Sequence, residues 1–212
     1  MYIPEPFAET DRETLFALIE AHPFGLLISA SDGALAGSHI PFVLDRASGA
    51  HGTLQAHLAR ANPQWRAFEG ETEVLCVFAG PHAYISPGWY PPGANAVPTW
   101  NYAVVHAYGV PRIVDDPNRV RAQQAALVET FEAARAAPWA LDDQPERYVA
   151  GMLKGIVAFE IPIARLEGKS KLSQNHPEAN RRGAITGLRA EAADDPLSQA
   201  IARLMAARER AR

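Results

Sequence analysis

The sequence is poor in cysteine, in lysine and in long apolar runs. Its 212 residues include a single cysteine, Cys76, so no disulfide can form within the chain. Cys76 lies in an apolar run, Val74–Phe78, which predicts a small buried side chain rather than a reactive thiol. No run of about eighteen apolar residues occurs, so we expect no membrane-spanning helix. The N-terminal segment also lacks the pattern of a signal peptide, and we expect a cytoplasmic protein.

The charge balance gives little support to nucleic-acid binding. The net charge is −4, so no overall positive field attracts a polyanion. The one basic patch, Arg203–Arg212, is interpreted as a solvated helix end, which leaves direct DNA binding open. A composition of 48% hydrophobic and 21% charged residues is typical of a chain with a large core.

Sequence motifs for nucleotide, metal and acyl chemistry are missing. The chain has no Gly-rich P-loop and no GxGxxG, HExxH, CxxC or GxSxG pattern. His51 and His57 would share one face of a strand, but at a separation of about 20 Å they cannot bind one metal ion. We therefore predict no metal site and assign no catalytic residue.

Alternating apolar residues and turn signals predict a mainly β fold with peripheral helices (α+β). The capping box Thr10-x-x-Glu13 opens a first helix, and Asp32-Gly33 predicts a hairpin turn. An inserted helix is expected at about 117–136, and the chain after Gly168 is expected to be irregular. This pattern favours a closed antiparallel barrel over residues 1–190 and a C-terminal helix over 191–212. The expected strands are 24–30, 35–44, 51–58, 73–79, 83–86, 99–114 and 156–163.

The stretch from Gly80 to Gly109 is the richest in aromatic and polar side chains. In a strand, Trp100 and Tyr102 share one face, and Thr99 and Asn101 share the other. Together with a loop rich in proline and glycine, this mixture predicts a pocket for a flat ligand with a polar edge. The alternative interpretation is a barrel core that contains satisfied polar groups.

The basic residues are distributed unevenly. Arginine outnumbers lysine seventeen to three, and Lys154, Lys169 and Lys171 fall within one eighteen-residue stretch. A compact ammonium group suits a phosphate or an anionic ring, so these lysines are candidates for anion binding. Chance placement on a solvated turn is the alternative.

A third candidate site joins an expected strand to a short helix. The segment His57–Pro63 contains Arg60 and a helix start at Asn62-Pro63. Free N–H groups at a helix start, with a guanidinium nearby, can bind a mononucleotide phosphate. Arg60 on a solvated face is the simpler interpretation.

Several stretches together resemble the PaiB-type family of FMN-binding negative transcriptional regulators, within the FMN-binding split-barrel superfamily. They occur in the expected order over roughly residues 1 to 190. The matching stretches are Ser38–Phe42, His57–Trp65, Gly80–Pro87, Val97–Tyr102, Lys154–Val157 and Gly168–Asn175.

The resemblance implies a fold, a cofactor and a partner. It implies a six-stranded antiparallel Greek-key split barrel that forms a homodimer with FMN at the interface. His57, Arg60 and Asn62 would lie at the phosphate, and Lys169 and Lys171 beside the flavin. The residues implied near the ring system are Thr99, Trp100, Asn101 and Tyr102, and His39 occupies the second strand where relatives often have a lysine or arginine.

Besides direct DNA binding, three functions remain open at this point. The resemblance favours a flavin-binding regulatory or sensor protein that acts indirectly on transcription. The alternative is an FMN-dependent oxidoreductase with His106 or Tyr102 as proton donor. A further alternative is haem binding with His176 as axial ligand.

Overall fold

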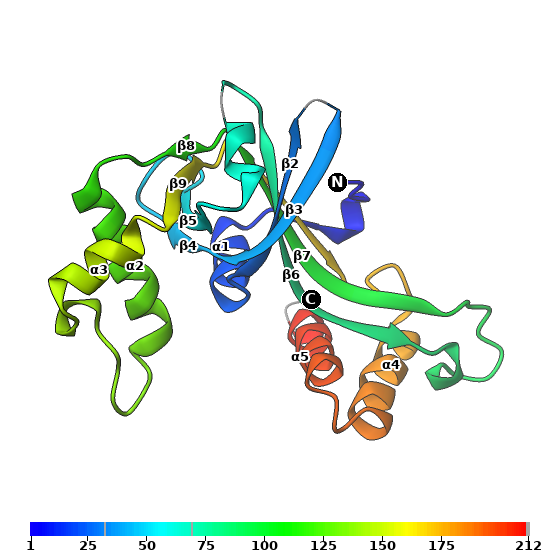
Figure 1. The fold of residues 1–212 in the computed structure, drawn as a ribbon. Coiled ribbons are helices and arrows are strands. Elements are labelled where there is room, and N and C mark those ends of the chain that lie inside the picture. The colour runs from blue at the N-terminus through cyan, green and yellow to red at the C-terminus, as the bar shows by residue number, and fades with distance from the viewer. Residues whose placement is uncertain (32, 69, 211–212) are drawn as a thin grey trace. The chain divides into compact units, whose positions relative to one another are not determined.

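The computed structural model describes residues 1–31, 33–68 and 70–210 (Figure 1). By its internal contacts the chain divides into two compact units. The terminal unit comprises Met1–Leu18, Ala79–Val105 and Glu167–Arg212, and the central unit comprises Ile19–Phe78 and His106–Leu166. Within the described ranges, no helix is both long and apolar enough to cross a membrane.

The described chain is mainly β, with helices before, between and after the strands. The strands are β1 (Ala8–Glu9), β2 (Phe24–Ser31), β3 (Ala34–Pro41), β4 (Val43–Asp45), β5 (Thr53–Ala59), β6 (Val74–Ile85), β7 (Thr99–Gly109), β8 (Arg112–Ile113), β9 (Ile156–Pro162) and β10 (Arg165–Lys171). The α-helices are α1 (Arg12–Ala21), α2 (Pro117–Glu132), α3 (Glu146–Leu153), α4 (Glu178–Glu191) and α5 (Pro196–Arg210). Short 3₁₀ helices are η1 (Glu5–Phe7), η2 (Pro63–Phe68), η3 (Pro87–Trp89) and η4 (Leu141–Asp143).

The strands form two sheets. The larger sheet has six strands in the order β1-β10-β7-β6-β2-β3, and the smaller has the order β4-β5-β9-β8. In the terminal unit, β1 and β10 pair antiparallel, with Ala8 opposite Lys169. In the central unit, β5 pairs antiparallel with β9 along its whole length, from Thr53 opposite Pro162 to Ala59 opposite Ile156. The mainly β, antiparallel fold predicted from the sequence is therefore confirmed.

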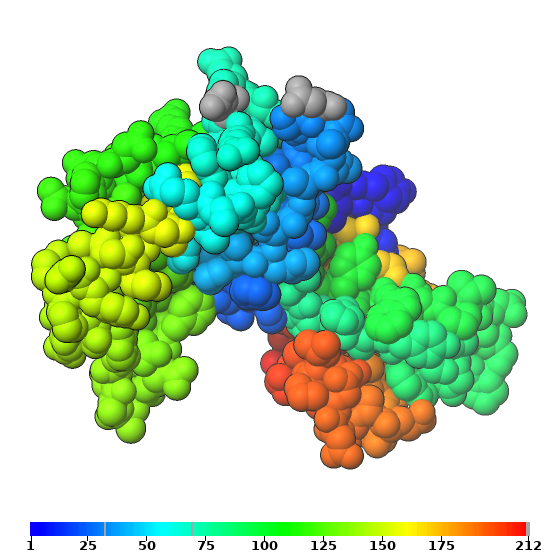
Figure 2. Space-filling model, in the orientation of Figure 1, coloured from blue at the N-terminus to red at the C-terminus, as the bar shows by residue number. Residues whose placement is uncertain are grey.

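The core of the terminal unit lies under α4 and α5, which pack beside the β6–β7 hairpin (Figures 1 and 2). Ile85 from β6, Leu188 from α4 and Ile201 from α5 are each fully buried. Gly187 lets α4 approach η3 closely, because a methyl group at this position would overlap the Trp89 ring. This packing joins the C-terminal helices firmly to the hairpin.

The core of the central unit is built from aromatic and branched side chains. Phe42 packs edge-on against Phe78 at 5.3 Å, and Phe68 lies 4.8 Å from Phe159, measured between ring centroids. Cys76 is fully buried, and burial raises the pKa of its thiol, as expected of a structural cysteine. The prediction that Cys76 is a buried side chain is confirmed.

Several local predictions were wrong. Asp11, and not Thr10, caps α1: its carboxylate accepts hydrogen bonds from the backbone N–H and the hydroxyl of Thr14. The predicted strands 73–79 and 83–86 are one continuous strand, β6, that runs through Pro81. The chain after Gly168 is regular, because it continues β10 and then forms α4; polar residues hid both elements.

Two other elements are shorter than predicted. The expected strand 99–114, for which the sequence predicts a bend near Gly109 or Pro111, is interrupted at that point: β7 ends at Gly109, where a side chain would collide with the Pro162 carbonyl, and β8 follows. The inserted helix α2 ends at Glu132 rather than near 136, and the second insert helix, α3, was not predicted. Of the predicted hairpin turn, Gly33 has a φ of 78°, whereas Asp32 lies outside the described residues. The end of the basic patch, residues 211–212, also lies outside them.

Candidate functional site

A pair of lysines on β10 is the most unusual polar feature of the terminal unit. Lys169 is only 9% exposed, although a lysine is rarely buried without an ionic partner. Its ammonium donates a hydrogen bond of 3.0 Å to the Tyr2 carbonyl. It also lies 5.4 Å from the centre of the Tyr102 ring and 5.6 Å from that of Tyr2, within range of a cation–π interaction.

Lys171 lies two residues further along the same strand. Its ammonium donates to the Thr99 hydroxyl at 2.5 Å and to the Trp100 carbonyl at 2.6 Å. Burial lowers the pKa of Lys171, and the nearby charge of Lys169 lowers it further. Among the described residues, no carboxylate forms an ion pair with either lysine. The two ammonium groups are therefore hydrogen-bonded to carbonyl and hydroxyl oxygens, which are neutral and leave both positive charges uncompensated.

Strand β7 places its predicted site residues on opposite faces. Trp100 is 54% exposed, and its ring lies 6.0 Å from that of Tyr84 and 6.1 Å from that of His82. Asn101 is fully buried, and its amide donates to the Ser173 hydroxyl at 3.0 Å. Trp100 is thus available to a ligand, whereas Asn101 fixes the segment after β10.

A pocket of about 720 Å³ lies beside Lys171 in the terminal unit. Its lining includes the polar residues Thr99, Asn101, Ser173 and His176. Ser173 has a φ of 62°, a conformation that non-glycine residues seldom adopt, and its bond to Asn101 holds it there. Ser173 lies within the motif Gly168–Asn175, but no sequence signal pointed to its backbone conformation, nor to the contact of Lys169 with Tyr2.

The turn after β5 uses its polar side chains within the central unit. The guanidinium of Arg60 donates to the carbonyl groups of Lys154 at 2.9 Å and Ile156 at 2.7 Å. The side-chain NH₂ group of Asn62 donates to the Ser38 hydroxyl at 2.9 Å. The side-chain oxygen of Asn62 accepts a hydrogen bond from the backbone N–H of Gln64, at the start of η2. Asn62 therefore caps a short helix, as the sequence predicted, while Arg60 keeps one nitrogen, Nη1, for other partners.

The two predicted histidines of the central unit differ in environment. His57 on β5 is half-buried, and burial lowers the pKa of its imidazole. Its Nδ1 atom is buried and has no hydrogen-bond partner within the described structure. His39 on β3 is exposed, with its ring 6.2 Å from that of Phe24.

The described residues fit a flat anionic cofactor best at the lysine pair. The pair supplies positive charge without a competing carboxylate, and the adjacent pocket is large enough for a small organic ligand. The two candidate proton donors belong to different units: Tyr102 lies beside Lys169, and His106 lies 3.4 Å from the Tyr108 hydroxyl. Each unit thus brings together its own predicted residues. The central unit holds Arg60 and Asn62, and the terminal unit holds Thr99, Trp100, Tyr102, Lys169 and Lys171.

Comparison with solved structures gives the fold. The flavocytochrome Anf3 from Azotobacter vinelandii superposes with a TM-score of 0.57 at 15% identity, covering 77% of this chain and 69% of that chain. The FAD and haem binding protein from Mycobacterium smegmatis gives a TM-score of 0.57 at 18% identity, covering 77% and 73%. At these identities the likeness establishes a shared split-barrel architecture.

Comparison of sequences gives the family. The sequence model of a family described as "Putative FMN-binding domain" matches residues 1–165. The Bacillus subtilis protein named "Protease synthase and sporulation protein PAI 2" is 34% identical over 205 residues, which cover 97% of this chain and 96% of that protein. An uncharacterized protein of Emericella nidulans, AN0679, is 35% identical and covers 88% of this chain and 90% of its own length. The chain therefore belongs to the PaiB-type family of FMN-binding split-barrel proteins.

Proposed function

We propose that this protein binds FMN at the lysine pair of β10 and acts as a flavin-binding regulatory or sensor protein. The observation that carries the proposal is the burial of Lys169 beside Lys171 with no carboxylate partner within the described residues. Burying an ammonium group without an anion is costly, and a bound anion offsets that cost. The family to which the chain belongs identifies FMN as the anion of choice.

Each residue of the site has a distinct role in this proposal. Lys169 and Lys171 bind an anionic part of FMN, either its phosphate or the edge of the ring. The half-buried ring of Tyr102 offers a stacking face beside Lys169, and the Thr99 hydroxyl holds the Lys171 ammonium in place. The exposed indole of Trp100 lies outside the pocket beside Lys171 and offers a second stacking face to a ligand that extends beyond it. A bound flavin would supply a centre that accepts one or two electrons.

A role in transcription is the second part of the proposal. The Bacillus subtilis relative carries a name that refers to protease synthesis and sporulation, and we propose a regulatory role of the same general kind here. Because the net charge of −4 gives no field that attracts DNA, we propose that the regulation is indirect. We also propose that the protein acts in the cytoplasm. A mobility-shift assay should then show no preference for any promoter sequence.

A homodimer is the third part of the proposal. β3 is the last strand in the order of the larger sheet, and an unpaired edge favours association. Leu35 on β3 is 79% exposed and Phe24 on the neighbouring β2 is 65% exposed, so a second copy could cover both. Light scattering after gel filtration should give twice the 23.0 kDa mass of the chain. A single-chain mass at micromolar concentration would rule the dimer out.

FMN titration tests the cofactor site. Flavin fluorescence should be quenched as flavin-free protein is added, and Lys171→Gln should weaken binding about tenfold, as expected for the loss of one hydrogen bond to a charged group. Lys154→Gln is the matched control, because Lys154 is exposed and belongs to the central unit. Equal weakening by both variants, or no binding by the unmodified protein, would refute the site. A Soret band on hemin addition, without any response to FMN, would favour the haem alternative.

A further inference from the structure

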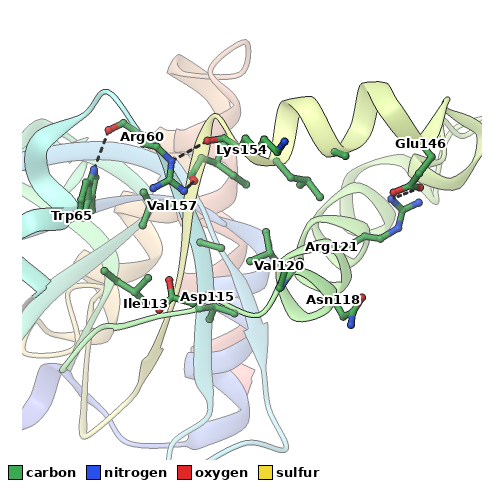
Figure 3. Close-up of a pocket in the computed structure, with 16 residues that line it drawn as sticks. Arg60, Trp65, Ile113, Asp115, Asn118, Val120, Arg121, Glu146, Lys154 and Val157 are labelled. Atoms are coloured by element: carbon green, nitrogen blue, oxygen red, sulfur yellow. Dashed lines mark hydrogen bonds and ion pairs between the residues drawn. The ribbon is translucent and has the colours of Figure 1, made fainter.

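The central unit contains a second pocket that the flavin proposal does not use. It has a volume of about 480 Å³ and lies between the strands β8 and β9 and the helices α2 and α3 (Figure 3). Pockets that bind small organic molecules have volumes of about 300–1,000 Å³. All of its lining residues belong to the central unit, whereas the lysine pair belongs to the terminal unit.

Much of the pocket wall is apolar. Val120 from α2, Ala150 and Leu153 from α3, and Ile113 and Val157 from β8 and β9 line it. Such a wall favours a ligand with an aliphatic or aromatic body, because burial of apolar surface contributes about 25 cal/mol per Å². The two helices of the insert thus contribute directly to a binding surface.

One end of the pocket carries positive charge. Two nitrogens of Arg60 donate to the main-chain carbonyls of Lys154 and Ile156, which hold the guanidinium in one orientation (Figure 3). Within the ranges that the structure describes, neither Arg60 nor Lys154 forms an ion pair with a carboxylate. The N–H groups of Arg60 Nη1 and the ammonium of Lys154 are therefore available to an anion.

The other charges of the lining do not cancel this end. Arg121 on α2 forms ion pairs with Asp142 at 2.8 Å and with Glu146 at 3.1 Å, so this cluster of the insert holds two carboxylates for one cation. The remaining acidic group of the lining is the exposed Asp115. The lining carries three cations, Arg60, Arg121 and Lys154, against two carboxylates, Asp115 and Glu146. Among the described residues Arg60 and Lys154 have no ion-pair partner, so an anion is favoured at their end of the pocket.

We propose that this pocket binds a small amphipathic carboxylate, with its carboxylate group at Arg60 and Lys154 and its apolar body against Val120, Ala150 and Leu153. In a regulatory protein such a ligand would be the effector, and only this last step rests on the proposed function. Binding itself does not depend on the flavin.

Calorimetry with 4-phenylbutyrate, and with 4-phenylbutan-1-ol as its uncharged counterpart, tests the proposal. The intact protein, with or without FMN, should bind the acid, and the alcohol should bind about tenfold more weakly, as expected for a lost hydrogen bond to a charged group. Ala150→Trp should abolish binding by filling the pocket. Lys154→Gln should weaken it about threefold to tenfold, since Lys154 is exposed and its contact is partly screened.

Matched controls separate these effects from misfolding. Gly151→Trp adds the same indole one position along α3, where a new Cβ meets no atom within 4 Å, and should leave binding intact. Arg147→Gln is the control for Lys154→Gln: it removes an exposed charge of α3 that does not line the pocket, and it should leave binding of the acid unchanged. Lys169→Met, which alters the proposed flavin site, should leave 4-phenylbutyrate binding unchanged.

Four results would overturn the proposal. These are no binding of the acid at millimolar concentration, equal binding of the alcohol, unchanged binding by Ala150→Trp, and displacement of the acid by FMN. Displacement by FMN would assign the pocket to the flavin instead. If FMN fails to bind while the acid binds as described, the flavin proposal fails and the effector pocket stands.

Discussion

Replacing Lys169 by methionine separates the binding role of this residue from any structural role. Methionine has a similar length, so the change removes the charge and the hydrogen bond to the Tyr2 carbonyl but keeps most of the packing. A hydrogen bond to a charged group contributes about 1.5–3 kcal/mol, so FMN should bind roughly ten- to a hundredfold more weakly. The assay is a fluorescence titration of flavin-free protein.

The same variant should fold at least nearly as well without flavin. In the flavin-free protein Lys169 is a buried charge with no carboxylate partner among the described residues, and removing it relieves a desolvation cost. The lost bond to one carbonyl offsets part of this gain, so we expect the free energy of unfolding to change by about 1 kcal/mol or less. Lys154→Met, an exposed position in the central unit, is the control and should leave both quantities unchanged. An unchanged FMN affinity in Lys169→Met would refute the reasoning, and so would a large loss of stability without flavin.

Three further changes test packing, capping and ionisation. Gly187→Ala forces a methyl group into the Trp89 ring and should lower the free energy of unfolding by about 1–3 kcal/mol; an unchanged melting temperature would contradict this packing. Asn62→Ala removes the cap of η2 and the bond to Ser38, and should cost about 1 kcal/mol in a urea titration, whereas a cost near zero would mean that the cap is not needed. Burial lowers the pKa of His57 below its unfolded value of 6.5, so the unfolded state takes up its proton first as the pH falls. Stability should be full above about pH 6.5 and decline as the pH falls toward the folded pKa, and His57→Gln should flatten this decline; coincident pH curves would show that His57 does not contribute.

The sequence predicted strands best where apolar residues alternate. β2 and β9 were predicted within a residue or two, because one face of each is buried in the core. β10 was missed, because its sequence Arg165–Lys171 is polar and its burial depends on partners far along the chain, such as β1. Helix α4 was missed for a similar reason: the buried Arg181 pairs with Glu209 of α5, a partner that only the fold provides.

The candidate site was predicted in part. The clustering of Lys169 and Lys171 and the motif Thr99–Tyr102 were visible in the sequence, and the structure joins them through the bonds from Lys171 to Thr99 and Trp100. The contact of Lys169 with Tyr2 spans 167 positions of the sequence and left no local signal. The use of the Arg60 side chain by main-chain carbonyls was also hidden, because only the backbone path of β9 brings them within reach.

An absorbance spectrum of the purified, untagged protein, recorded before and after addition of FMN and gel filtration, tests the central claim most directly. Bound oxidised flavin should appear as two bands in the near-ultraviolet and blue, and heat denaturation should release FMN into the filtrate. The bands should be lost when Lys169 and Lys171 are both replaced by neutral residues. A colourless protein that retains no FMN after gel filtration, or a double variant that retains it as well as the unmodified protein, would contradict the account.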